Sequence, residues 1–70
     1  MDTATKTALG YTLGAEVLAL TGVFAGQYGL IDEIDPTDEF KPYRVRFEDI
    51  DGEPIAWYPA TGIKPTGSIR

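Results

Sequence analysis

The feature that most constrains the fold is the close spacing of turn-forming residues, which leaves no room for a long helix. Glycine, proline or aspartate interrupts the chain about every 8–12 residues, and this spacing is typical of all-β barrels and sandwiches. The hydrophobic segments between these breaks have the length of strands, and no window keeps a helical period. We predict strands over residues 16–20, 28–35, 43–47, 55–58 and 63–64. The sequence therefore predicts an all-β domain.

The segment 43–47 gives the clearest strand. Three apolar side chains alternate there with two arginines, in the order Tyr43, Arg44, Val45, Arg46 and Phe47. Because successive side chains of a strand point to opposite faces, the apolar residues should face the core and the arginines the solvent. Asp51-Gly52, which follows, is a strong hairpin signal.

The glycine spacing of residues 14–35 resembles a known motif. Gly22, Phe24, Gly26 and Gly29 lie between two predicted strands, and the segment ends in Ile34-Asp35. This arrangement is similar to the KOW motif of ribosomal proteins and transcription elongation factors, a strand–loop–strand unit within an SH3-like barrel. The spacing has a physical reason, because the loop must reverse with one aromatic ring beneath it and Gly29 must allow two backbones to approach closely.

The second half of the chain resembles another group with the same barrel. Residues 42–47 are similar to a strand of the small electron-transport accessory subunits, which implies a docking role without redox chemistry. The two resemblances together imply a small five-stranded SH3-like barrel over residues 14–65. We expect residues 1–13 to form a flexible N-terminal segment and residues 66–70 a tail.

The composition narrows the function classes. Six basic residues stand against 11 acidic ones, and the net charge of −5 makes a phosphate-gripping surface less expected than a basic protein partner. The chain has no cysteine and no histidine, so it has no disulfide, no zinc-finger ligands and no usual base or nucleophile. We therefore expect no catalytic residues, no metal and no cofactor.

Targeting signals are not evident. Residues 1–8 lack the charged start and apolar stretch of a signal peptide, and no apolar run approaches the length of a membrane span. We expect a cytoplasmic protein that is a monomer.

The aromatic residues are the leading candidates for a partner-binding surface. The candidates are Phe24, Tyr28, Phe40, Trp57 and Tyr58. Phe24 and Phe47 also suit the core. Trp57 and Tyr58 are adjacent in a strand and point to opposite faces, so at least one of them should be partly exposed, as aromatic residues at binding hot spots are.

Lys41, Arg44 and Arg46 form the basic stripe of the sequence. As a nucleic-acid contact the stripe is small. The alternative is that the arginines pair across strands with carboxylates, for which Glu33, Asp35 and Glu53 are the candidates.

The segment 32–39 carries five carboxylates. Calcium binding is the specific hypothesis, but the segment lacks the central glycine and terminal glutamate of a calcium loop. A solvated loop, or a docking loop for a basic partner, fits better.

Two leucines stand at outward positions of the first predicted strand. If Val17 and Ala19 face the core, Leu18 and Leu20 face outward. Either the N-terminal segment, through Tyr11 and Leu13, covers them, or they belong to an interface.

These observations predict a non-catalytic adaptor domain that docks onto a protein through the loops at the barrel rim and an outward aromatic residue. The rim would consist of residues 23–28, residues 35–42 and the outward residue of the fourth strand. The alternatives are a KOW-like module associated with nucleic acid, and a structural subunit of a larger assembly such as a phage particle.

Overall fold

A computed structural model of the chain describes residues 11–69. Five strands make up the fold: β1 (Ala15–Ala19), β2 (Tyr28–Ile34), β3 (Tyr43–Arg46), β4 (Ile55–Tyr58) and β5 (Ile63–Ile69). A single 3₁₀ turn, η1 (Ala60–Gly62), joins β4 to β5 and is the only helical element in the described residues. The predicted all-β class is confirmed.

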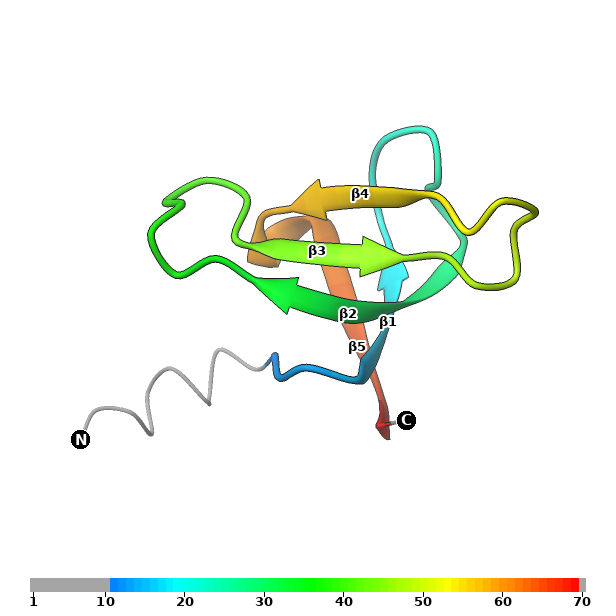
Figure 1. Cartoon of the computed structure of the whole chain (residues 1–70), viewed down its shortest axis with the longest axis horizontal. Helices are drawn as coiled ribbons and strands as arrows, with labels where there is room; N and C mark the ends of the chain where they lie inside the picture. The colour runs from blue at the N-terminus through cyan, green and yellow to red at the C-terminus, as the bar shows by residue number, and fades with distance from the viewer. Residues whose placement is uncertain (1–10, 70) are drawn as a thin grey trace.

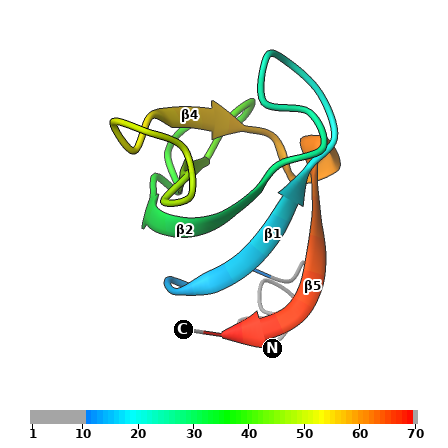
Figure 2. The ribbon, with the colours of Figure 1, turned by 90° about the vertical axis from the view of Figure 1, so that its right-hand side faces the viewer.

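The strands form one antiparallel sheet in the order β4-β3-β2-β1-β5 (Figure 1). Figure 2 shows that the sheet curls strongly, so that β1 and β5 turn away from the direction of β4. The two edge strands, β4 and β5, are not paired with each other. The expectation of a barrel is corrected in this respect, because the curled sheet is not closed.

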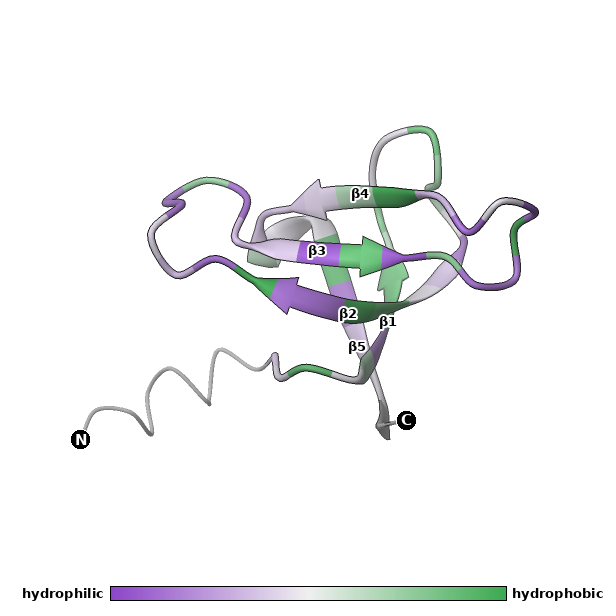
Figure 3. Ribbon diagram, viewed as in Figure 1, coloured by the Kyte–Doolittle hydropathy of each residue, from purple (hydrophilic) through white to green (hydrophobic). Residues whose placement is uncertain are grey.

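The core lies on the concave side of the sheet. Its buried residues are Val17, Ala19, Ile31, Val45, Phe47, Tyr58 and Ile63. The inward positions predicted for β1 and β3 are confirmed, with Tyr43 half-buried against this cluster. Figure 3 shows hydrophobic stretches in β1, β3 and β4 and in the loop after β1, while the two loops that flank β3 are mostly hydrophilic.

Gly29 lies where β2 packs tightly against β3 and Phe47. A Cβ atom at this position would collide with Val45 Cγ1 and would lie 3.0 Å from both the Arg46 carbonyl oxygen and the Phe47 ring. The ring of Phe24 stacks on Phe47 with 4.6 Å between centroids. The two expectations drawn from the glycine spacing, a close approach at Gly29 and an aromatic ring beneath the loop, are confirmed.

The segment before β1 packs against the domain. The Tyr11 hydroxyl donates a hydrogen bond to the Ile63 carbonyl oxygen at 3.2 Å, and the Tyr11 ring lies edge-on to Tyr43 with 5.0 Å between centroids. The flexible segment was expected over residues 1–13, of which residues 1–10 lie outside the described part of the chain. Leu13 and Leu20 are 61% and 45% exposed, so the alternative in which Leu13 covers Leu20 is not found.

The fifth strand is longer than the sequence suggested. Residues 66–69 were expected in a tail, but they continue β5, with Ala15 opposite Ile69. Pro65 and Gly67 are poor strand formers. The register shifts between Ala15 and Val17, and Gly67 adopts a φ of 90°. Pairing with β1 therefore outweighs the low strand preference of these two residues.

Gly29→Ala should destabilise the domain, because the added methyl group must displace Val45 or separate β2 from β3. Overpacking of this kind costs about 1–3 kcal/mol. Urea denaturation should show a lower midpoint, and a midpoint equal to that of the unsubstituted chain would contradict the close approach. Gly62→Ala, whose Cβ would lie 3.2 Å from the nearest atoms, should cost less.

Candidate functional site

The surface is hollowed on two sides of Trp57. One hollow lies between β4 and the loop after β1, and is lined by Thr21, Gly22, Val23, Phe24, Lys41, Ala56, Trp57, Tyr58 and Pro59. The other lies between β4 and the loop after β2, and is lined by Asp35, Asp38, Lys41, Ala56 and Trp57. Three residues line both hollows, so we treat the two as one surface and call it the Trp57 groove.

Strand alternation directs Trp57 outward. Ala56 and Tyr58 face the core, so Ile55 and Trp57 point to the convex side of the sheet. Trp57 lies opposite Arg44 on β3 and is half-buried, whereas Tyr58 is 5% exposed. The prediction that one of the two adjacent aromatic residues is partly exposed is confirmed, and the exposed one is Trp57.

The acidic loop between β2 and β3 is fixed by its own carboxylates. Asp35 Oδ1 accepts hydrogen bonds from the Thr37 amide at 3.0 Å and the Thr37 hydroxyl at 2.6 Å. Asp38 Oδ1 accepts hydrogen bonds from the amides of Phe40 and Lys41 at 2.8 and 2.9 Å. The amide of Lys41 and then that of Phe40 lower the pKa of Asp38 from its ordinary value of 3.8. The loop thus holds the carboxylates of Asp35 and Asp38 in place beside Trp57.

The structure brings together only some of the predicted partner-binding residues. Phe24 and Trp57 line the groove. Tyr58 also lines it, but this residue is 5% exposed and belongs to the core. Phe40 is 77% exposed on the acidic loop, and Tyr28 is 53% exposed; neither is among the residues that line the groove.

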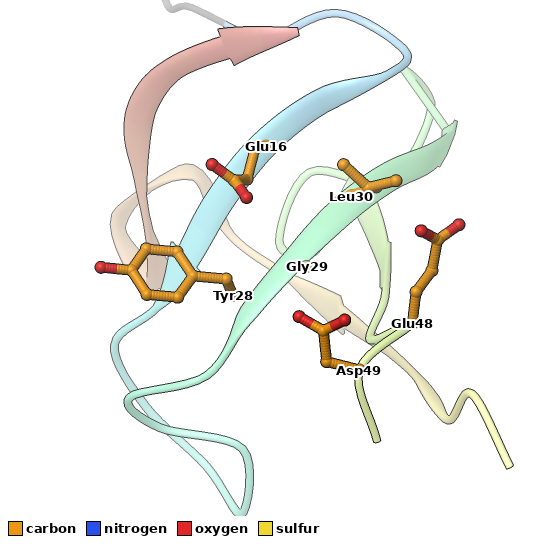
Figure 4. A pocket seen from close by; sticks show the side chains of 6 residues that line it. All are labelled: Glu16, Tyr28, Gly29, Leu30, Glu48 and Asp49. Carbon is orange, nitrogen blue, oxygen red and sulfur yellow. The ribbon is translucent and has the colours of Figure 1, made fainter. Parts of the chain in front are cut away.

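Tyr28 borders two other hollows. It lies opposite Leu18 of β1, and these two residues line a depression together with Lys64, Pro65 and Thr66 of β5. Figure 4 shows the other hollow, which carries carboxylates from β1 and from the segment after β3; its lining residues are Glu16, Tyr28, Gly29, Leu30, Glu48 and Asp49. Glu16 accepts a hydrogen bond from Thr66, and Glu48 pairs with Arg46. These carboxylates therefore have structural roles.

The arginines of β3 pair with carboxylates. Arg44 makes a bidentate contact with Asp32, at 2.7 and 3.2 Å, and lies 3.2 Å from Glu33. The side-chain hydrogen bond with Asp32 raises the pKa of Arg44 above its ordinary value. The register shift between Ile31 and Glu33 explains how one arginine reaches two successive carboxylates.

Arg46 pairs with Glu48 at 3.1 Å and lies 3.9 Å from Glu53 and 4.0 Å from Asp32. Pairing of both arginines was one of the two sequence interpretations, and it is confirmed with Glu33 and Glu53. Asp32 was not expected as a partner, because the sequence gives no sign of the register shift. Lys41 lies away from these pairs, at the groove.

Residues 11–69 contain no group of three or more carboxylate, histidine or cysteine side chains placed to hold a metal ion. Nor does this part of the chain include a helix long and apolar enough to cross a membrane.

Comparisons of the chain with protein-family models, with curated proteins and with solved structures found no match.

Alkaline pH should destabilise the domain through Tyr58. Burial raises the pKa of Tyr58 above 10.0, so the folded state holds this proton after the unfolded chain has lost it. The stabilisation is complete below pH 10 and is lost as the pH rises through the folded pKa. Urea midpoints between about pH 9 and pH 12 should fall. Tyr58→Phe should flatten this fall, and the exposed Tyr28→Phe should leave it unchanged; equal slopes in all three would contradict the assignment.

Asp32→Asn should increase binding to polyanions, because it weakens the pairing that neutralises Arg44 and Arg46. Retention on heparin at low salt should rise, with a steeper salt dependence. Glu39→Gln is the matched control, since it removes the same charge from the exposed acidic loop and should change retention less. Equal effects of the two variants would show that net charge alone governs retention.

Proposed function

We propose that this chain is a non-catalytic adaptor domain that docks onto a protein partner through the Trp57 groove. The observation that carries the proposal is a half-buried tryptophan set between two loops, with carboxylates on one side and an anchored aromatic ring on the other. Tryptophan is enriched at binding hot spots because it provides a large apolar area with few rotatable bonds.

The groove is supported from within. Phe24 stacks on the fully buried Phe47, and the amide of Gln27 donates a hydrogen bond to the Phe24 carbonyl oxygen at 2.9 Å. The acidic loop carries the side-chain bonds made by Asp35 and Asp38. A partner would therefore meet a surface that is ordered before binding, which lowers the entropic cost of association.

The alternative of a KOW-like nucleic-acid module has less support. The guanidinium groups of Arg44 and Arg46 already contact carboxylates, so a phosphate would have to compete with Asp32, Glu33 and Glu48. Lys41 is exposed, but a single lysine releases few counterions. A third candidate, a structural subunit of an assembly such as a phage particle, rests on the exposed Leu20.

Within this proposal the fold is related to SH3-like barrels, with residues 14–35 as the KOW-like unit, and the protein works in the cytoplasm as a monomer. The supporting features are the bent five-stranded sheet, the ring beneath the loop and the close approach at Gly29.

Trp57→Ala should abolish capture of the partner from an extract of the native cell. Loss of a hot-spot tryptophan weakens binding by about 2 kcal/mol or more, roughly 30-fold. Lys64→Ala, an exposed change on β5 outside the groove, should retain the same partner. Recovery of that partner by folded Trp57→Ala protein, with the fold checked by NMR, would overturn the proposal.

A further inference from the structure

The two edges of the sheet differ in how their backbone groups are used. In an antiparallel sheet, alternate residues of an edge strand direct N–H and C=O groups away from the neighbouring strand. Just before β5, the Leu20 amide donates a hydrogen bond to the Gly62 carbonyl oxygen at 2.9 Å, so Leu20 and Gly62 are a hydrogen-bonded pair. By alternation along the register with β1, Ile63 and Pro65 of β5 direct their backbone groups outward. Tyr11 donates its hydroxyl to the Ile63 carbonyl, and Pro65 has no N–H. This stretch of the β5 edge is thereby blocked.

The β4 edge has no such protection. The Phe47 amide bonds to the Pro54 carbonyl oxygen at 2.9 Å, and the register of β3 with β4 then makes Val45–Ala56 and Tyr43–Tyr58 the hydrogen-bonded pairs. Ile55 and Trp57 therefore direct their N–H and C=O groups outward. Among the turn, loop and side-chain hydrogen bonds of residues 11–69, none involves these four groups.

The open edge overlaps the groove at Trp57. Ala56 and Trp57 line both hollows although their side chains point to opposite faces of β4, as expected if the hollows follow the edge of the strand. A chain segment lying there would have Trp57 and Ile55 beside one of its faces, and the Val23–Phe24 loop beside the other. The space next to the unpaired backbone is thus already bounded by side chains.

We propose that the Trp57 groove takes an extended basic peptide segment of the partner, which adds to the sheet as a sixth strand beside β4. This inference rests on the proposed docking function and specifies the chemistry of the partner. Main-chain hydrogen bonds to Ile55 and Trp57 hold the segment, and its alternating side chains contact the walls of the groove.

The charges determine the kind of segment. Asp35 and Asp38 line the groove, and each uses Oδ1 in the bonds that order the loop. Lys41 is the one cation among the groove residues. A lysine or arginine of the partner would meet these carboxylates. A second copy of this chain would bring a net charge of −5 against the same acidic loop, so the occupant is a different, basic chain.

Trp57 provides the assay, because it is the single tryptophan of the chain. The probe is a capped octapeptide of alternating lysine and valine, compared with a glutamate–valine peptide and with the lysine peptide N-methylated at every second residue. Only the unmodified lysine peptide should change the Trp57 fluorescence saturably, with a dissociation constant below about 1 mM. Hydrogen exchange at the Ile55 and Trp57 amides should slow when it binds.

Ile55→Pro separates pairing of the edge from side-chain docking. It removes an outward N–H and no bond to β3, at a position that is 48% exposed. Ile55→Pro should lower the affinity for the lysine peptide by about tenfold or more. Ile55→Ala, which keeps the N–H, should lower this affinity by less than about threefold. The double variant Asp35→Asn with Asp38→Asn keeps the Oδ1 acceptors that order the loop. It should lower the affinity for the lysine peptide, and the loss should be largest at low salt.

The outcomes distinguish this inference from the proposed function. Absence of saturable binding, equal binding of the glutamate or N-methylated peptide, or an unchanged affinity in Ile55→Pro would overturn strand addition. A dimer in light scattering, with the Ile55 and Trp57 amides already protected, would show that a second copy occupies the edge. If the native partner needs Trp57 but binds Ile55→Pro normally, docking stands and strand addition fails. If Trp57→Ala and Ile55→Pro both fail to capture the native partner while Ile55→Ala captures it normally, docking and strand addition are both supported.

Discussion

The enclosure of Phe47 is the interaction on which the rest of the structure depends. Its ring is fully buried, stacks on Phe24 and lies 6.4 Å from the ring of Tyr58. Gly29 leaves the space that this ring and Val45 occupy. In a domain without disulfides, burial of one such ring provides about 1.5–3 kcal/mol, a large share of a stability of roughly 0.05–0.15 kcal/mol per residue. The same packing holds the loop after β1 against the core, and this loop forms one wall of the groove.

The charges of the domain are divided between two surfaces. On the convex face, Arg44 and Arg46 are surrounded by carboxylates, so the stripe that looks basic in the sequence is neutralised in the fold. At the rim, the carboxylates of Asp35 and Asp38 bond to backbone amides beside Trp57, and these bonds lower the pKa of Asp38. The acidic character of the chain is thus displayed where the surface is hollow, which favours a basic protein over a nucleic acid as partner.

The unequal edges of the sheet connect the fold with its proposed role. An unpaired edge strand can join other chains, and proteins usually block it with proline or a covering segment. The stretch of β5 next to η1 is blocked in both ways, through Pro65 and Tyr11. The β4 edge is bordered by prolines at Pro54 and Pro59 but is open at the two residues that direct their backbone outward between them. The open part is short, which limits unwanted association while leaving room for a specific segment.

The sequence alone determined the features that depend on neighbouring residues. Strand alternation predicted that Val45 and Phe47 face the core and that Trp57 and Tyr58 point to opposite faces of the sheet. The glycine spacing predicted the close approach at Gly29. Tertiary structure decided what depends on pairing between distant segments. Strand β5 extends through residues expected to form a tail, and the sheet stays open between β4 and β5. Trp57, and not Tyr58, is the ring that points outward. The register shift that brings Asp32 to Arg44 also comes from this pairing, because no glycine marks the position between Ile31 and Glu33 as a bulge.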